Sequence, residues 1–321
     1  MKNLYETPKI EKKEEKQDYV FEQFHNVDFP IEEFPEIFER VIELANMPSS
    51  HFDDAVKMSQ IVELLWNDIE KEGEFNLSIK ELKLACLFHD IGKSGPADAS
   101  REERMMIEQI FNPTFFRISS EKFKNAVEFK DKEPKEASKV IRTLPIAKVL
   151  EIENLPNKDK IIEYLKTLQL HVYNEETNSC TIEDVDPQKH DMITLWREHD
   201  IWTWQTLKEF GGNKISQELK IIASTHHTLE GHDPAALGGK VPDEAIALET
   251  IDKYSIITLV DKYQAFIVRS NVDHQQAIKI LENLIRDSKA KNIINHEDKV
   301  FNKFMKYLKI LDRHPEIAEN F

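Results

Sequence analysis

The sequence is poor in three features that would mark a specialised class of protein, namely cysteine, glycine and long apolar segments. It has 2 cysteines and 8 glycines in 321 residues. Cys86 and Cys180 belong to no CxxC pair, so there is no cysteine-based zinc or redox motif, and both are expected to be reduced thiols. No stretch approaches the roughly 20 apolar residues that a spanning helix needs. We therefore expect no disulfide framework and no membrane span.

Negative charge, in contrast, is in excess. The chain has 43 Lys and Arg residues against 59 Asp and Glu, a net charge of -16. Such a chain repels nucleic-acid duplexes and anionic membranes unless a basic patch opposes it, and the sequence shows no such patch. The N-terminal segment 1–20 is a mixed-charge stretch without the apolar core of a secretory signal. We expect a cytoplasmic protein, in which any anionic substrate would have to be drawn in by a concentrated positive charge such as bound metal ions.

Apolar residues recur with the helical period along nearly the whole chain, which predicts an all-α fold. Ser78 with Glu81, and Ser100 with Glu103, match the capping pattern of a helix start. The segment 170–183 alternates apolar and polar residues around a polar turn, as in a short β-hairpin. The predicted helices cover about 31–46, 50–72, 78–91, 100–111, 120–130, 157–169, 187–211, 216–230, 242–270, 273–288 and 296–312.

A carboxylate within an apolar helix is the first sign of a site. Asp261 lies in YSIITLVDKYQAFIVRS, which is apolar over most of its circumference. Burying that charge unpaired would cost several kcal/mol, roughly, so we expect Asp261 to face a cation or a metal ion. A salt bridge or a capping contact is the alternative for this residue taken alone.

The first half of the chain adds three more candidate ligands. His89 and Asp90 end the apolar helix of KLACLFHDIGK, where the chain is about to break at Gly92. Adjacent helical side chains diverge by about 100°, so two neighbours reach one site most easily in a last turn, which also favours a cation. His51 begins a helix whose apolar row directs the imidazole inwards. Alone, the first two would suggest a surface or capping pair, and His51 a satisfied core histidine.

The second half repeats this design. His226 and His227 end the helix in KIIASTHHTLEG, before a glycine. His199 lies upstream, within a predicted helix that also contains His190. The two are nine positions apart, about two and a half turns, and would point to opposite faces. We expect one of them, His199, to serve the site.

Together these residues run in the order His, His-Asp, His, His-His, Asp, over positions 51 to 261. This order resembles the HD superfamily of metal-dependent phosphohydrolases, most closely the HD-GYP branch of cyclic-dinucleotide phosphodiesterases. The separation of 27 positions between His199 and His226 is similar to that branch. The resemblance implies one metal ion held by His51, His89, Asp90 and Asp261, and a second, bridged by Asp90, held by His199, His226 and His227.

The sequence departs from that branch at three places. His232-Asp233-Pro234 stands where the branch has Gly-Tyr-Pro, so the resemblance does not extend to specificity for cyclic di-GMP. Asp90 and His199 are 109 positions apart, which indicates an insertion that lids or reshapes the pocket. Met47 precedes His51 by one helical turn, where three-metal members have a carboxylate, so we expect two ions.

These patterns predict the organisation of the chain. We expect a charged tail over 1–25, followed by an HD-type helical domain formed by 26–111 and 187–272. Residues 112–186, richer in proline and charge than their flanks, are expected to form an inserted subdomain. Residues 273–321 are expected to form helices that pack on the core.

The resemblance implies hydrolysis of a phosphate ester, with Asp90 bridging the ions and orienting the attacking hydroxide. Lys93 would bind a phosphate oxygen and stabilise developing charge, with a solvated helix-end lysine as the alternative. His232 and Arg269 are further candidate substrate contacts. Mixed imidazole and carboxylate ligation suits iron or manganese, with nickel or zinc as alternatives, rather than magnesium.

Three other functions stay open. One is a di-iron oxygenase of the HD fold, against which the doubled histidine and Lys93 argue. Another is a mononuclear nucleotidase that uses only His51, His89, Asp90 and Asp261. The last is an inactive binding or signalling module, which would have no need to keep so many polar side chains facing inwards.

Overall fold

A computed structural model describes residues 8–47, 51–72, 78–111, 140–155, 157–174, 179–230, 248–269, 272–290 and 297–320. Within these ranges all regular secondary structure is helical except for one antiparallel hairpin, in which β1 (Gln169–Asn174) pairs with β2 (Ser179–Asp184). The all-α fold with a short hairpin is therefore confirmed. The helix predicted near 120–130 lies outside the described residues.

The first part of the chain forms α1 (Pro8–His25), α2 (Pro35–Asn46), α3 (His51–Glu72), α4 (Ile79–Phe88) and α5 (Arg101–Phe111), with the short 3-10 turns η1 (Ile31–Glu33) and η2 (Ile91–Ser94). Around the hairpin come α8 (Ile146–Glu153), α9 (Lys158–Leu165), α10 (Met192–Arg197) and α11 (His199–Phe210). The remainder forms α12 (Gln217–Ser224), η5 (Thr228–Glu230), α13 (Leu248–Gln264), the π-helical turn η7 (Ala265–Arg269), α14 (His274–Ala290), α15 (Glu297–Asp312) and α16 (Glu316–Asn320).

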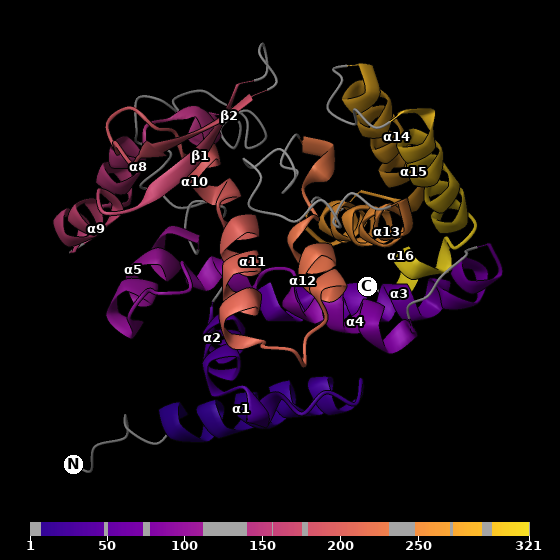
Figure 1. Cartoon of the computed structure of the whole chain (residues 1–321), viewed down its shortest axis with the longest axis horizontal. Coiled ribbons are helices and arrows are strands. Elements are labelled where there is room, and N and C mark those ends of the chain that lie inside the picture. Colours follow the sequence, from indigo (N-terminus) through magenta and orange to yellow (C-terminus); the bar gives the residue numbers. More distant parts are fainter. Residues whose placement is uncertain are drawn as a thin grey trace.

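Two hydrophobic cores meet at α11. The larger core is built from α1 to α4 and α12 to α16, and the smaller from α5, α8 to α10 and the hairpin. Figure 1 shows the elements of the smaller core on the left, α14 and α15 at the upper right, and α11 and α12 between them. Helix α11 supplies Trp202 to the smaller core and Leu207 to the larger one. The start of this helix therefore lies where both cores fix its position.

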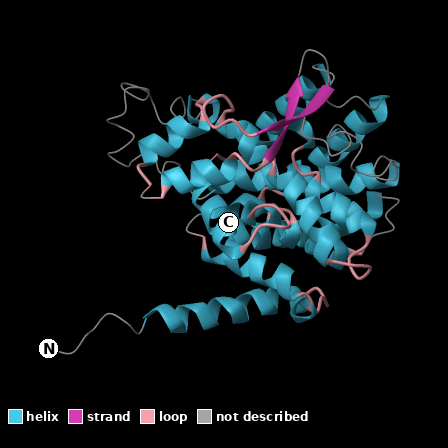
Figure 2. Cartoon of the chain, turned by 60° about the vertical axis from the view of Figure 1, so that its left-hand side comes forward, coloured by secondary structure: helices cyan, strands magenta, loops and turns pink. Residues whose placement is uncertain are grey.

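The hairpin and α1 lie at opposite ends of the molecule (Figure 2). Residues 8–25, which were expected to be part of a charged tail over 1–25, form α1. Val20 and Phe24, one helical turn apart, are fully buried in the larger core. Tyr19 and Phe21 are partly buried and pack against the same core, so apolar residues of the last two turns hold a helix that is otherwise highly charged. Among the described residues, none of the helices is long and apolar enough to cross a bilayer.

Local signals predict several element starts correctly. Ser78 and Glu81 form the expected capping box at the start of α4. Ser100 and Glu103 make the same reciprocal bonds before α5. The single helix predicted over 187–211 is wrong, because the chain breaks at Glu198 between α10 and α11. The helix predicted over 216–230 is shorter, because α12 ends at Ser224, and α8 was not expected.

Candidate metal centre

Five helix ends deliver the expected ligands to one place. His51 begins α3, His89 and Asp90 follow α4, and His199 begins α11. The remaining two contributions are the pair His226-His227, which follows α12, and Asp261, in the last turn of α13. Most of these side chains are buried, with exposed fractions of 7% for His51, 1% for His89, 3% for Asp90, 4% for His199 and 1% for His226. The structure brings all seven expected residues into one cluster.

Asp90 lies at the centre of this cluster. Its Oδ2 is 3.6 Å from His51 Nδ1 and 3.4 Å from His89 Nε2. Its Oδ1 is 3.3 Å from His199 Nε2 and 3.6 Å from His226 Nε2. Each carboxylate oxygen therefore faces a different pair of imidazoles, which is the arrangement that a carboxylate shared by two ions needs.

Three of the imidazoles are oriented in the same way by the backbone. In each, Nδ1 donates to the carbonyl oxygen of the residue three positions earlier. The pairs are His89 with Cys86 at 2.7 Å, His199 with Trp196 at 2.5 Å and His226 with Ala223 at 3.1 Å. A carbonyl oxygen can only accept, so Nδ1 carries a proton in each of these rings and Nε2 is the atom that faces the cluster. Metal-binding histidines are commonly fixed by such a bond on the opposite nitrogen.

The protonation states leave an excess of lone pairs at the centre. Burial lowers the pKa of His199 to about 4 and also lowers the pKa of His226, so both rings are neutral at pH 7. Their Nε2 atoms are 3.0 Å apart, and Asp90 Oδ1 faces both. Two lone pairs and a carboxylate this close together repel one another unless a cation lies among them. The donor set therefore fits a metal ion.

Lys93 adds a positive charge to the first half of the cluster. Its Nζ contacts the Asp90 carboxylate and lies 3.3 Å from His51 Nδ1. Burial raises the pKa of Asp90, but the neighbouring His89 and Lys93 outweigh burial and hold this pKa well below its ordinary value. Asp90 is therefore an ionised carboxylate, as a metal ligand must be.

A second lysine, Lys262, has a similar position at Asp261 and was not among the candidates from the sequence. Its Nζ is 3.2 Å from Asp261 Oδ2 and 2.8 Å from His227 Nδ1. Asp261 Oδ1 lies 4.0 Å from His89 Nε2. Burial raises the pKa of Asp261, but Lys262 and the surrounding imidazoles lower it further than burial raises it. Asp261 is therefore ionised, as Asp90 is.

Gly92 lets α11 approach the turn that carries His89 and Asp90. A Cβ atom at Gly92 would lie 2.0 Å from the carbonyl oxygen of His199 and 2.4 Å from the backbone nitrogen of Thr203. The Thr203 hydroxyl accepts from Gly92 N and donates to His89 O, both at 3.0 Å. This contact fixes His89-Asp90 against the start of α11, where His199 lies.

A buried arginine anchors the loop that follows η2. The Arg40 guanidinium donates to Ser94 Oγ and Gly95 O, both at 3.0 Å, and to Pro96 O and Ala97 O, both at 2.8 Å. Arg40 is 1% exposed. Four bonds from one rigid fork hold the backbone just after Lys93, so the cluster has a fixed wall on this side.

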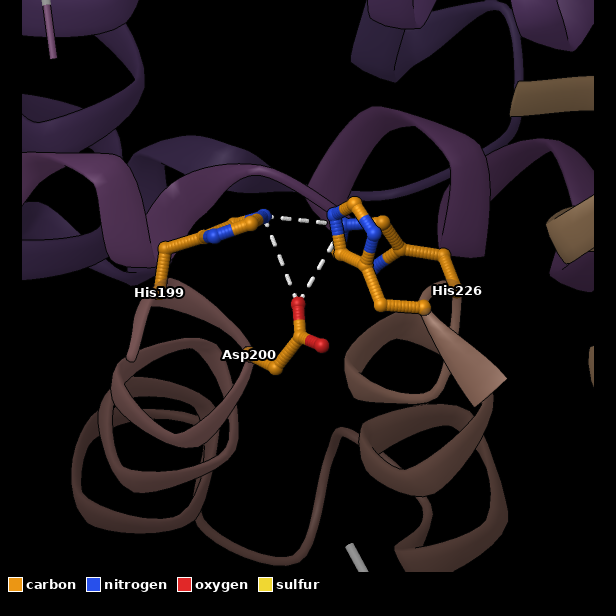
Figure 3. A group of neighbouring side chains, drawn as sticks. His199, Asp200 and His226 are labelled. Atoms are coloured by element: carbon orange, nitrogen blue, oxygen red, sulfur yellow. Dashed lines mark hydrogen bonds and ion pairs between the residues drawn. The ribbon is translucent and has the colours of Figure 1, made fainter. Parts of the chain in front are cut away.

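Sequence reasoning missed Asp200, the residue directly after His199. Asp200 is fully buried, and its Oδ1 lies 3.3 Å from the Nε2 atoms of both His199 and His226. Figure 3 shows this carboxylate between the two imidazoles. The signal that points to it is the His-Asp dipeptide at 199–200, one of four in the sequence, the others being at 89–90, 190–191 and 232–233.

The other candidates have mixed outcomes. His232 lies outside the described residues, and Arg269 is the last residue of η7, with its side chain outside the description. His190 stands apart from the cluster, as expected, although for a different reason. It precedes α10, and its Nδ1 accepts from Asp186 N at 3.0 Å. Met47, expected one turn before His51, is a buried residue at the end of α2.

Among the described residues, two overlapping groups of side chains could hold a metal ion. One is His199, Asp200, His226 and His227, and the other is His89, Asp90 and His226. Comparison of the chain with protein-family models, with curated proteins and with solved structures found no match. The helical architecture and the buried cluster are compatible with an HD-like fold, and the function must be inferred from the site itself.

Proposed function

We propose that the chain is a metal-dependent phosphohydrolase, and specifically a phosphodiesterase that acts on a nucleotide or cyclic dinucleotide through a binuclear site. The observation that carries this proposal is the position of Asp90, whose two oxygens face two separate pairs of imidazoles. A shared carboxylate of this kind supports two ions rather than one.

The cluster divides into two sets of ligands around Asp90. His51, His89 and Asp261 would hold the first ion with it, and His199, His226 and His227 the second. Two such ions supply a nucleophilic hydroxide near neutral pH and neutralise the phosphoryl oxygens during in-line attack. Imidazoles mixed with carboxylates favour iron or manganese, with nickel or zinc as alternatives.

The chain's own side chains supply the remaining functions. Asp90 accepts a hydrogen bond from the attacking water and so orients it. Lys93, which contacts Asp90, donates to a non-bridging phosphate oxygen and stabilises the negative charge that develops there. The two ammonium groups of Lys93 and Lys262 and the metal ions give a net acidic protein a local positive region for an anionic substrate.

The test is elemental analysis of anaerobically purified protein, followed by a screen of phosphodiesters, monoesters and nucleotides with each metal found. We expect two ions per chain and turnover of at least one diester. Absence of hydrolysis across the panel contradicts the proposal and favours an inactive binding module. Dioxygen consumption by the iron(II)-loaded protein, without hydrolysis, would instead identify an oxygenase.

Replacing His227 by Ala tests the binuclear arrangement. We expect this variant to retain one ion and to lose most of the activity, because a ligand of one ion has been removed while the other set is intact. His190→Ala is the matched control, since His190 is buried but bonds outside the cluster, and it should keep both ions. A single ion in the wild-type protein, with full activity in His227→Ala, would favour the mononuclear nucleotidase.

A further inference from the structure

Asp200 occupies a position that the implied ligand sets do not include. Its side chain is fully buried, at the first turn of α11, and points between two imidazoles (Figure 3). We propose that Asp200 is a direct ligand of the second metal ion, together with His199, His226 and His227. This inference rests on the metal centre of the proposed function and is independent of the reaction that the centre performs.

The spacing of the donor atoms supports direct coordination. The Nε2 atoms of His199 and His226 are 3.0 Å apart, and Asp200 Oδ1 is 3.3 Å from each. Neighbouring donors around one ion with bonds of about 2.1 Å are separated by about 3.0 Å at right angles and about 3.4 Å in a tetrahedron. All three edges of this triangle fall within that range, so one ion can contact the three atoms without any movement of the chain.

The two imidazoles are held in place by bonds on their other side. Nδ1 of His199 and of His226 each donate to a backbone carbonyl, so the Nε2 atom of each ring is directed towards Asp200 Oδ1. The fold therefore directs three donor atoms of the kinds that bind metal ions, two imidazole nitrogens and a carboxylate oxygen, towards one point.

A carboxylate in the first turn of a helix is also favoured by the helix dipole, which is the alternative explanation for Asp200. That effect favours a side chain that points towards the free backbone amides of its own helix. Asp200 is fully buried, and its Oδ1 is placed against ring nitrogens from α11 and from the end of α12. The helix dipole accounts for neither contact.

Coordination by Asp200 would make the two halves of the centre similar in charge. The first half has Asp261 as its own carboxylate, and the second half would have Asp200, with Asp90 shared between them. Three carboxylates would then offset three of the four positive charges of two divalent ions. An added oxygen ligand also makes the second site harder, which favours manganese and iron over softer ions.

The experiment is a titration of metal-free protein with Mn²⁺, followed by calorimetry and by the loss of the free-ion electron paramagnetic resonance signal. We expect two ions for the wild type. In Asp200→Asn we expect one ion to bind as before and the Kd of the second to rise by at least about 100-fold, more than the 10–100-fold typical for the partner of a ligand. The proposal is overturned if the second Kd stays within about 3-fold of wild type.

Glu198→Gln is the matched control. Glu198 flanks His199 on the other side and is equally buried, but its carboxylate bonds to the backbone and side chain of His171 in β1. This variant should bind both ions as the wild type does. If Glu198→Gln and Asp200→Asn lose the second ion equally, the effect comes from displacement of α11, and Asp200 is not a ligand.

A gain-of-function variant keeps the test decisive if Asp200→Asn folds poorly. In Asp200→Cys loaded with Cd²⁺, a coordinated thiolate gives an ultraviolet charge-transfer band, and the wild-type protein provides the baseline for its native cysteines. Absence of an added band overturns the proposal. The outcome is also separate from the fate of the proposed function. If the wild type binds one ion and Asp200→Asn binds none, Asp200 is still a ligand but the binuclear site is excluded. If the wild type binds no ion, both the proposed function and the role of Asp200 are excluded.

Discussion

The two His-Asp pairs of the candidate metal centre, at 89–90 and 199–200, can be compared directly, because one follows α4 and the other begins α11. Both histidines have Nδ1 bonded to the carbonyl oxygen three residues earlier, Cys86 for His89 and Trp196 for His199. Trp196 belongs to α10, so His199 also follows a helix end, because the chain breaks at Glu198. The helix end therefore orients the imidazole in both pairs, and the break between α10 and α11 creates the second such end.

The pairs differ in what their carboxylates reach. Asp90 faces imidazoles with both of its carboxylate oxygens and also contacts Lys93. Asp200 faces only His199 and His226, and it does so with one oxygen, Oδ1. The first carboxylate is therefore expected to matter to both ions, and the second to one of them.

Asp90→Asn should have the largest effect. Removing the shared charge weakens both sets of ligands, so we expect both Mn²⁺ dissociation constants to rise by more than about 100-fold and hydrolysis to fall below detection. Metal titration of this variant beside Asp200→Asn measures the difference between the pairs. Equal losses in the two variants would contradict the distinction.

Gly92→Ala should come next, because it breaks the contact that holds the pairs together. The added methyl group would lie 2.0 Å from a backbone oxygen, which cannot move aside as a flexible side chain would. We expect a loss of more than about 3 kcal/mol in the free energy of unfolding, measured in urea, together with loss of metal. Gly212→Ala is the control. The φ of 54° at Gly212 strains an alanine, but no atom lies within 4 Å of the added Cβ, so we expect a loss of about 1–2 kcal/mol in unfolding free energy.

Thr203→Val should have a smaller effect on the same contact. It keeps the shape of the side chain but leaves the amide of Gly92 and the carbonyl of His89 without their hydroxyl partner. We expect a loss of about 1–3 kcal/mol in unfolding free energy with both ions retained. Thr206→Val, one turn later, is the control, because among the described residues the Thr206 hydroxyl has no hydrogen-bond partner and its loss should be nearly neutral. Similar costs for the two variants would show that Thr203 does not join the pairs.

The sequence predicted those parts of the structure that depend on local signals. The capping boxes at Ser78 and Ser100 and the hairpin are encoded within a few residues each, and all are present. Helix α1 was missed because its stability depends on the burial of Val20 and Phe24 against other helices. The break at Glu198 was missed for the same reason, since neither glycine nor proline marks it and its carboxylate bonds to the distant His171.

The same distinction applies to the candidate site. The order of histidines and aspartates predicted seven side chains that do lie together. Asp200 and Lys262 were missed because adjacent residues on a regular helix point in different directions, and each follows a residue already assigned to the site. The helix end before His199 and the reach of the Lys262 side chain overcome that divergence, and neither can be deduced from periodicity alone.

The hydrogen bonds that fix Nδ1 of His89, His199 and His226 have a consequence for how ions enter the centre. Because each of these rings is bonded to its own chain segment, the orientation of its Nε2 atom is fixed before any ion binds. Uptake then requires no refolding, and its speed should be governed by how fast an incoming ion sheds its water molecules. Ions that exchange their bound water slowly, such as nickel, should therefore bind to this centre more slowly than manganese does.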